Sequence, residues 1–324
     1  RVNRTLAEDD HVTQFELLSA AALWQMAERC VDVAVVEAGL GGRYDATSVI
    51  DARLAVLTNV GLEHTRWLGP TLKDIAEEKL AGLAPEATLV LGANLPSVAL
   101  EVAERVAGER QARIVRAPVA PASIPLRASG AFQRRNFTLA LTAAETYLSG
   151  AGIPMQERRV AAAAASTDVP GRLQRVADDP PTVLDGAHNP DAIAALVESL
   201  PEVLPERPLA VVLGVLEDKD APRMLGALLP LCERAWFTAP PSSRALSPAA
   251  LQSLARQLEF DATVCEPRPL RALAQAQAWA REHGGAVLVT GSVYLVGEVL
   301  GALQQSPATA APSEQARRSG GSSR

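Results

Sequence analysis

Two polar residues near the start of the chain could take part in chemistry, because each lies at or just after the end of a largely apolar run. Glu37 lies near the end of the run Val31–Ala38, just before a glycine turn, Gly39–Arg43, and His64 follows the run Leu54–Val60. A buried carboxylate is costly unless a positive charge meets it. One carboxylate and one imidazole suit a Mg²⁺ ion that keeps waters for a phosphate. The pattern suggests a metal site; a surface acid on a tight turn and a structural histidine are the plainer alternatives.

Two further polar positions lie on predicted helices. Lys79 follows Glu77 and Glu78, and helix geometry by itself indicates a solvated charge there. Asn136 lies in the segment Gln133–Asn136, which begins another helix. Its amide either belongs to the helix start or hydrogen-bonds the edge of a purine, and periodicity does not distinguish the two.

The strongest local signal is the segment Val183–Pro190, VLDGAHNP. It is typical of a strand, a loop and a helix, with Asn189 as N-cap and Pro190 in the first turn. That capped turn explains Asn189 and Pro190 but leaves Asp185 and His188, on either side of a glycine, unexplained. Both lie at the carboxyl end of a strand, where open α/β sheets bind ligands, so a functional role is favoured.

A further cation stands just before this sheet. The guanidinium of Arg172 could offer a fork for a phosphate group.

Parallel strands and helices must position these groups. Unbroken rather than alternating apolar residues in Val31–Ala38 and Leu54–Val60 predict strands covered on both faces, hence a parallel sheet. A capping box at Thr13–Glu16 begins a helix that runs to about Arg29. One face of that helix is expected to pack on the sheet through Phe15, Leu18, Ala22 and Met26.

The alternation of helices and strands continues along the chain. In the first half, helices are expected at Thr71–Leu83, Ser97–Ala107, Gln133–Ser149 and Met155–Ser166, and strands at Thr88–Gly92 and Arg113–Arg116. The composition breaks at Ser166–Arg172, which places a domain boundary between residues 168 and 169.

The second half predicts a doubly wound sheet with right-handed crossovers. Its expected strands are Thr182–Leu184, Leu209–Leu213, Ala235–Thr238, Ala262–Cys265 and Ala286–Thr290. They alternate with helices at Pro190–Leu200, from about Pro222, after Ser247, at Leu270–Arg281 and up to about Leu303. Residues 306–324 have the composition of a disordered tail.

Bulk properties restrict the partners and the compartment. A net charge of −6 argues against nucleic acid or an anionic membrane as a partner, and 4% aromatic residues argue against base-stacking surfaces. The three cysteines are far apart, which favours a reducing cytoplasm over disulfides or a zinc cluster. No apolar run is long enough to span a bilayer, and no signal peptide is expected.

Six segments together resemble a known family. They are VVEAGLGGRYDATSVI, NVGLEHTRWLGPTLKDIAEEK, FQRRN, VPGRLQ, VLDGAHNPDA and TGSVYLVGEV. In this order they resemble the folylpolyglutamate synthase/dihydrofolate synthase family of the Mur ligase superfamily, from about Arg1 to Leu303. The resemblance implies an α/β fold: a Mur-ligase-like central domain of the P-loop type, residues 1–168 and N-terminally truncated, then a Rossmann-like C-terminal domain, residues 169–305.

The resemblance implies an ATP-dependent amide ligase that acts with Mg²⁺. ATP would phosphorylate a carboxylate of dihydropteroate or a folate, and the amine of L-glutamate would attack the acyl phosphate. By the same resemblance Glu37, His64 and Lys79 are the Mg²⁺ ligands. Lys79 would be carbamylated, which turns a cation into an anionic oxygen ligand and reverses the plain interpretation of this residue.

The resemblance also assigns the remaining site residues. Asn136, Arg172 and Asp185 match contacts to ATP, and the implied catalytic residues are Lys79, His64 and His188. The implied partners are small molecules alone, ATP, L-glutamate and dihydropteroate or a folate, bound by a cytoplasmic monomer.

One departure from the family pattern concerns the phosphate-binding loop. The chain contains no G-x-x-x-x-G-K-[ST] segment, whose backbone N–H groups carry much of the phosphate binding in such ligases. This polypeptide by itself is therefore expected to bind ATP poorly and to turn over little. The alternatives are a non-catalytic fragment that binds a nucleotide or folate, another Mur-type ligase, and a metal-dependent hydrolase built on Glu37 and His64.

Overall fold

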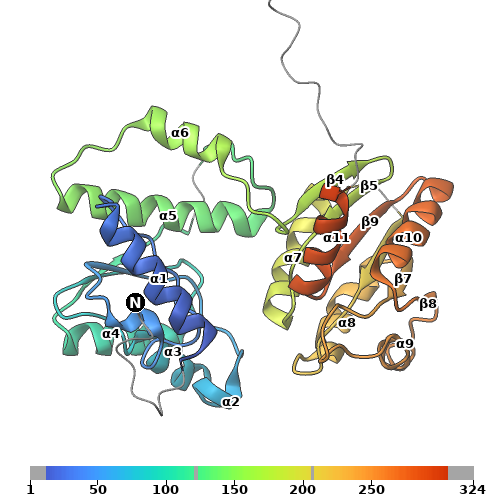
Figure 1. The fold of residues 1–324 in the computed structure, drawn as a ribbon, viewed down its shortest axis with the longest axis horizontal. Helices are drawn as coiled ribbons and strands as arrows, with labels where there is room; N and C mark the ends of the chain where they lie inside the picture. Colours follow the sequence, from blue (N-terminus) through green and yellow to red (C-terminus); the bar gives the residue numbers. More distant parts are fainter. Residues whose placement is uncertain (1–11, 120–122, 206–207, 306–324) are drawn as a thin grey trace, which may run out of the picture. The chain divides into compact units, whose positions relative to one another are not determined.

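A computed structural model describes residues 12–119, 123–205 and 208–305 (Figure 1). The chain forms two compact units, residues 1–125 with 134–163 and residues 126–133 with 164–324. The expected domain boundary between residues 168 and 169 stays a prediction. The expected disordered tail, 306–324, lies outside the described residues.

The first unit contains a parallel three-stranded sheet with the strand order β1-β2-β3. The strands are β1 (Leu54–Leu57), β2 (Thr88–Leu91) and β3 (Arg113–Arg116). In the central strand β2, the side chains of Leu89, Val90 and Leu91 are fully buried. The parallel pairing confirms the predicted parallel sheet. Coverage on both faces was predicted for Leu54–Val60 and holds only in part, because Val56 of β1 is 43% exposed.

Helices cover both faces of this sheet. On one face, α3 (Leu72–Leu80) and α4 (Ser97–Glu109) pack in one core cluster with Leu89 and Leu91. On the other face, Val90 packs with Leu139 of α5 (Ala131–Gly150). The helix α6 (Glu157–Ser166) follows α5 in the chain.

Two predicted helix starts of this unit are confirmed by their capping boxes, whereas α5 and α6 each begin two residues away from the predicted Gln133 and Met155. Thr13 and Glu16 form the capping box of α1 (Gln14–Glu28), and Thr71 and Asp74 form that of α3. Two short helical segments that were not predicted lie on either side of β1 in the chain: η2 (Ala46–Val49) and α2 (Thr65–Leu68).

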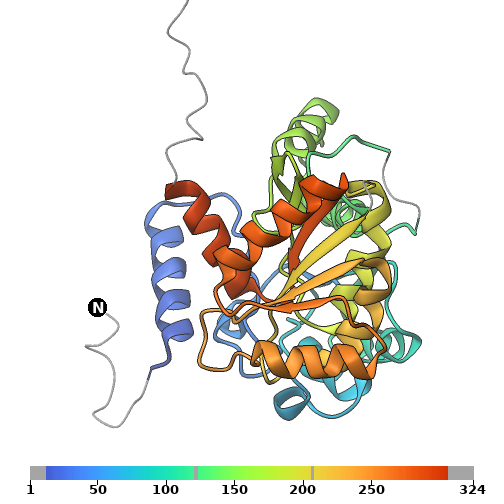
Figure 2. The ribbon, with the colours of Figure 1, turned by 90° about the vertical axis from the view of Figure 1, so that its right-hand side faces the viewer.

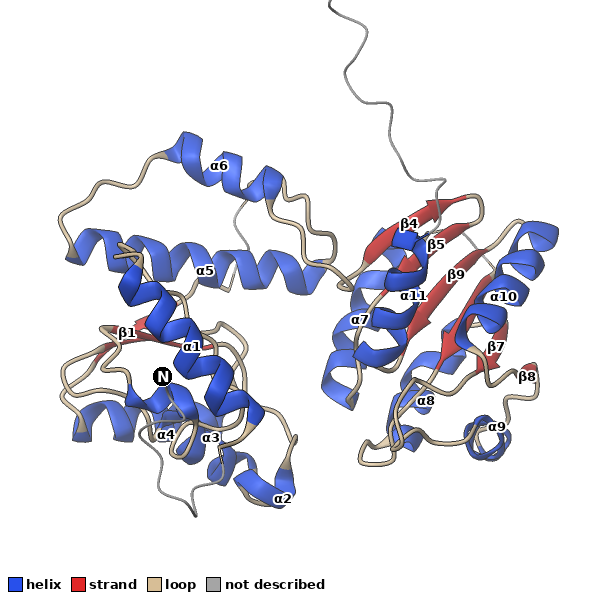
Figure 3. Cartoon of the chain, viewed as in Figure 1, coloured by secondary structure: helices blue, strands red, loops and turns tan. Residues whose placement is uncertain are grey.

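Two predictions for the start of this unit are wrong. Residues 31–38 form no strand, because no described strand pairs with their backbone (Figure 3). The helix α1 buries none of its residues, and Phe15 and Leu18 are 42% and 59% exposed. Apolar periodicity identifies a face that is suited to burial, but the face is buried only where a second surface meets it.

The second unit contains a six-stranded sheet with the order β4-β5-β9-β6-β7-β8. The strands are β4 (Gln174–Asp178), β5 (Pro181–Leu184), β6 (Leu209–Leu213), β7 (Arg234–Phe237), β8 (Thr263–Cys265) and β9 (Ala286–Thr290). All neighbours pair in parallel except β4 and β5. The edge strand β4 was not predicted, because none of its residues is fully buried and it lacks an apolar run.

Helices cover both faces of this sheet, which confirms the predicted doubly wound architecture (Figure 2). The core on one face includes α7 (Pro190–Val203), α8 (Ala221–Leu228) and α9 (Pro248–Gln257), with η3 (Leu229–Leu231) after α8. The core on the other includes α10 (Pro269–His283) and α11 (Val293–Gln305). Among the described residues, none of the helices has the length and hydrophobicity that a membrane span requires.

The strand order creates a switch point in the second unit. The last strand, β9, lies between β5 and β6, so the direction of winding reverses there. Ligands of open α/β sheets bind outside the carboxyl ends of the strands at such a point. A ligand site of this unit is therefore expected at the loops that follow β5, β9 and β6.

Candidate functional site

In the first unit, the glycine turn after Glu37 is seated on α3. A methyl group on Gly42 would collide with the carbonyl oxygen of Lys79. Gly41 has a left-handed backbone, φ +71°, and a methyl group there would lie 2.9 Å from the side chain of Leu68. Only glycine permits this close approach and this left-handed backbone. The turn thus joins the segment of Glu37 to the helix of Lys79 and to α2, which follows His64.

Asp45 holds this turn together through its carboxylate, which is 7% exposed. One oxygen accepts hydrogen bonds from the backbone N–H groups of Gly39 and Leu40, both at 2.8 Å. Arg43 does not pair with Asp45: its guanidinium lies 3.0 Å from a carboxylate oxygen of Glu78 of α3, and backbone N–H groups occupy the carboxylate of Asp45. Burial raises the pKa of Asp45, but the hydrogen bonds outweigh it and leave the pKa below its ordinary value.

The three residues predicted to bind Mg²⁺ are all exposed in the first unit. His64 has a left-handed backbone, φ 54°, and begins α2, with its Nε2 3.7 Å from a carboxylate oxygen of Glu63. Such a backbone is uncommon outside glycine and is found more often at functional positions. Glu37 and Lys79 form no side-chain hydrogen bond or ion pair with the described residues.

The chemistry of these donors fits Mg²⁺ on one condition. Among the described residues, no three His, Cys, Asp or Glu side chains lie close enough to hold a metal ion. Glu37 and His64 supply two of the donors in the predicted set, and Lys79 supplies the third only as a carbamate. A carbamate needs a solvent-accessible lysine nitrogen, and the exposed Lys79 meets that need.

In the second unit, the loop after β5 is built around Asp185, which is 3% exposed. One carboxylate oxygen accepts the backbone N–H of Leu173 at 2.9 Å and the other accepts that of Ala187 at 2.8 Å. Leu173 has a left-handed backbone, φ 45°, so this hydrogen bond stabilises an unusual turn. Asp185 thereby ties the segment of Arg172 to the loop of His188.

Burial raises the pKa of Asp185 above its ordinary value. The two backbone N–H donors and the positive charges of Arg172 and His188 oppose this effect without cancelling it. The carboxyl group therefore takes up a proton more readily than an exposed aspartate does.

Arg172 and His188 are positioned by the same loop. The guanidinium of Arg172 occupies the place that a side chain at residue 186 would fill, so Gly186 is required there. Nδ1 of His188 lies 2.9 Å from the carbonyl oxygen of Gly186. Because a carbonyl only accepts, this contact puts the proton of a neutral His188 on Nδ1 and makes Nε2 the basic nitrogen.

Neighbouring loops complete the carboxyl edge at the switch point. The N–H of Gly291, after β9, donates to the carbonyl of Ala187 at 3.0 Å, and Gly291 packs against the carbonyl of Gly214, after β6. The loop after Gly214 carries Lys219, whose side chain is only 11% exposed and lies 3.4 Å from Asp218. The sequence prediction missed Lys219, although the chain has only three lysines.

The predicted residues divide between the two units. Glu37, His64, Lys79 and Asn136 belong to the first, where Asn136 is exposed on α5. The structure brings Arg172, Asp185 and His188 together in the second unit. The assignment of roles to these residues stays a prediction.

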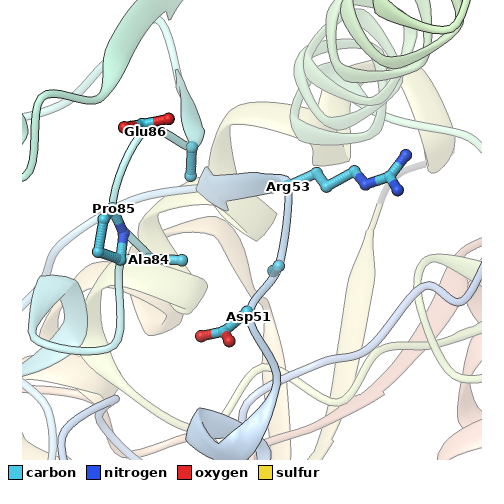
Figure 4. A pocket seen from close by; sticks show the side chains of 7 residues that line it. Asp51, Arg53, Ala84, Pro85 and Glu86 are labelled. Atoms are coloured by element: carbon cyan, nitrogen blue, oxygen red, sulfur yellow. The ribbon is translucent and has the colours of Figure 1, made fainter.

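A hollow of about 430 Å³ lies elsewhere in the first unit, just before β1 and β2. Its lining includes Asp51, Arg53 and Glu86 (Figure 4). The side chain of Arg53 extends away from the two carboxylates. The hollow thus lies at the amino ends of the strands and gathers no group of reactive side chains.

Comparisons with known proteins agree with the sequence resemblance. Residues 171–293 match the family model "Mur ligase, glutamate ligase domain". The chain is 32% identical to the folylpolyglutamate synthase of Lacticaseibacillus casei over 76% of this chain and 63% of that protein. It is 30% identical to the dihydrofolate synthase/folylpolyglutamate synthase of Escherichia coli K12 over 97% of this chain and 72% of that protein.

The fold agrees as well. The structure of Mycobacterium tuberculosis folylpolyglutamate synthase with ADP and AMPPCP superposes with a TM-score of 0.83 at 29% identity, over 91% of this chain and 74% of that one. The chain thus spans a little under two thirds of the Lacticaseibacillus protein and about three quarters of the solved one. Since the similarity to the Escherichia coli protein runs through both units, the chain belongs to the folylpolyglutamate synthase/dihydrofolate synthase family of Mur ligases.

Proposed function

We propose that this chain adds L-glutamate to dihydropteroate, to a reduced folate, or to both, at the expense of ATP. The observation that carries the proposal is the loop after β5, where Asp185 ties the backbone segments that carry Arg172 and His188 together, at the switch point of a domain that matches the glutamate ligase model. The proposed setting is the cytoplasm, with the chain acting as a monomer.

The proposed reaction has two steps. A carboxylate oxygen of the pterin substrate attacks the γ-phosphorus of ATP, which gives an acyl phosphate and ADP. The amine of L-glutamate then attacks the acyl carbon, an amide forms, and phosphate leaves with the former carboxylate oxygen. The α-amine of glutamate must lose a proton before it attacks, so a base has to lie near it.

Residues of the second unit are assigned to the nucleotide and to glutamate. The guanidinium of Arg172 would bind phosphate oxygens, and Asp185 would hold that guanidinium and its turn in place. Nε2 of His188 is suited to take the proton of the glutamate ammonium. The ammonium of Lys219 has the charge to bind a carboxylate of glutamate at the same edge.

Residues of the first unit are assigned to the metal and the purine. Glu37, His64 and carbamylated Lys79 would hold Mg²⁺, which supplies charge neutralisation on the transferring phosphoryl group. The amide of Asn136 would hydrogen-bond the nucleotide.

An isotope experiment tests the proposed reaction. Dihydropteroate labelled with ¹⁸O in its carboxylate is incubated with Mg·ATP and L-glutamate, and the released phosphate is analysed by mass spectrometry. One ¹⁸O atom should appear in the phosphate for each amide formed. Amide without labelled phosphate would reject the acyl phosphate, and cleavage of a substrate without ATP would favour the hydrolase.

A substitution at Gly186 tests the role of Arg172. The methyl group of Gly186→Ala would displace the guanidinium, which is the mobile end of a long side chain, so the stability cost is about 1 kcal/mol or less. Loss of a charged hydrogen bond to phosphate, about 1.5 kcal/mol or more, should weaken ADP binding at least about tenfold. Isothermal titration calorimetry measures this change.

The matched control is Gly226→Ala. Gly226 lies in α8, and a methyl group there would meet no atom within 4 Å. Alanine should stabilise that helix by about 0.5–1 kcal/mol and leave ADP affinity unchanged. An equal ADP affinity in the Gly186→Ala variant and the wild type would contradict the role given to Arg172.

A further inference from the structure

The carboxylate of Asp45 is saturated with hydrogen bonds from its own loop. Besides the N–H groups of Gly39 and Leu40, it accepts the N–H of Thr47 at 2.9 Å and the hydroxyl of Thr47 at 2.6 Å. An oxygen that accepts from two successive N–H groups fixes the direction of the backbone that carries them. That backbone begins two residues after Glu37.

The C-terminal end of the same turn is bound to α3, the helix that carries Lys79. The backbone N–H of Arg43 donates to the carbonyl of Glu78 at 3.2 Å, and Gly42 lies against the carbonyl of Lys79 with no room for a side chain. Gly82, just beyond α3, packs in turn near the carbonyl of Gly42. A displacement of the turn would therefore move Glu37 relative to Lys79.

We propose that Asp45 is a positioning residue for the cation site of Glu37 and Lys79. It sets the turn between them, so that the carboxylate and the modified lysine face one ion. The inference rests on the proposed function, because it takes the metal ligands from it, and it adds a residue that touches neither the metal nor the substrates. Residues that orient metal ligands typically change metal affinity about 10- to 100-fold when they are replaced.

The test compares cation affinity in three proteins. Asp45→Asn keeps the size of the side chain but replaces one acceptor oxygen with an NH₂ group, which cannot accept from Gly39 and Leu40. Glu16→Gln is the matched control in the same unit, because Glu16 also accepts two hydrogen bonds, both from Thr13 of its capping box. Binding of Mn²⁺, a stand-in for Mg²⁺ that electron paramagnetic resonance detects, is titrated in bicarbonate buffer.

The expected result is Mn²⁺ binding by the wild type and by Glu16→Gln with the same affinity, and a loss of about tenfold or more in Asp45→Asn. Urea unfolding of each protein accompanies the titration, since a purely structural role would lower stability without changing the affinity of the folded protein. Thr47→Val, which removes one donor to Asp45, is the milder variant and is expected to weaken Mn²⁺ binding by a smaller factor.

Two results would overturn the inference in distinguishable ways. Equal Mn²⁺ affinity in folded Asp45→Asn and the wild type would reject the positioning role and leave the proposed ligase function intact. If Asp45→Asn does not fold, an unchanged affinity in Thr47→Val rejects the role in the same manner. Absence of Mn²⁺ binding by the wild type would reject both the inference and the proposed metal ligands.

Discussion

Alanine in place of Lys79 is expected to lower the rate of glutamate addition at least about 100-fold. Loss of an anionic metal ligand removes several kcal/mol of charge stabilisation at the phosphoryl group, and about 2.7 kcal/mol corresponds to a factor of 100. The amide product is measured by mass spectrometry. Lys73→Ala is the matched control, because Lys73 is an exposed lysine of the same helix and has no assigned role.

Two further variants separate a carbamate from a simple cation at this position. Lys79→Arg keeps the positive charge but cannot form the carbamate, so it should be as inactive as Lys79→Ala. In the wild type and in Lys73→Ala, labelling with ¹³C-bicarbonate should give a carbamate signal in the NMR spectrum that Lys79→Ala lacks. Activity retained in Lys79→Arg would show that Lys79 acts as a cation.

Asp185→Ala is expected to lower the free energy of unfolding of the second unit by about 2–4 kcal/mol. The substitution leaves the buried N–H groups of Leu173 and Ala187 without an acceptor, at about 1–3 kcal/mol each, while it relieves the burial of a carboxylate. Asp185→Asn retains one acceptor oxygen and should lose about half as much. Urea unfolding measures both, and a loss under 1 kcal/mol in the alanine variant would contradict this account of the loop.

The difference in stability between the wild type and Asp185→Asn is expected to change with pH in a definite direction. Because burial raises the pKa of Asp185 in the folded protein, the folded state binds a proton more tightly than the unfolded state does. The stability of the wild type relative to Asp185→Asn should be greatest below the ordinary aspartate pKa of about 3.9. It should fall as the pH rises through the raised pKa and then level off, and an increase with pH over this range would contradict the raised value.

Apolar runs predicted the central parts of the fold well, because a strand buried on both faces has a distinctive composition. Leu209–Leu213 and Ala286–Thr290, whose residues are all buried, were predicted with the bounds that the structure shows. The run Val31–Ala38 has a similar composition but forms no strand, since a strand also needs a pairing partner. The polar edge strand β4 has a partner but lacks the composition.

The residues of the candidate site also differ in how far the sequence alone could predict them. Asp185 and His188 were predicted from the residues alone, because a capped turn did not explain them. Lys79 was assigned only through the family resemblance, since helix geometry favours a solvated charge at that position. The partners of Asp45 could not be predicted, because a sequence does not show which backbone N–H groups a carboxylate accepts from.

Lys219 was missed although the sequence contains a signal for it. Only three of the 31 Lys and Arg residues are lysines, so a lysine is an unusual choice at any position of this chain. Two of them, Lys79 and Lys219, have proposed roles that suit a compact ammonium or its carbamate.

The most direct test of the central claim is the requirement for substrates in amide formation. The chain is incubated with Mg·ATP, L-glutamate and either dihydropteroate or a reduced folate, and the product is followed by mass spectrometry. The glutamate adduct is expected to accumulate only when all three substrates are present. Binding of ADP with no adduct under any condition, or an adduct that forms without ATP, would contradict the assignment as a glutamate ligase.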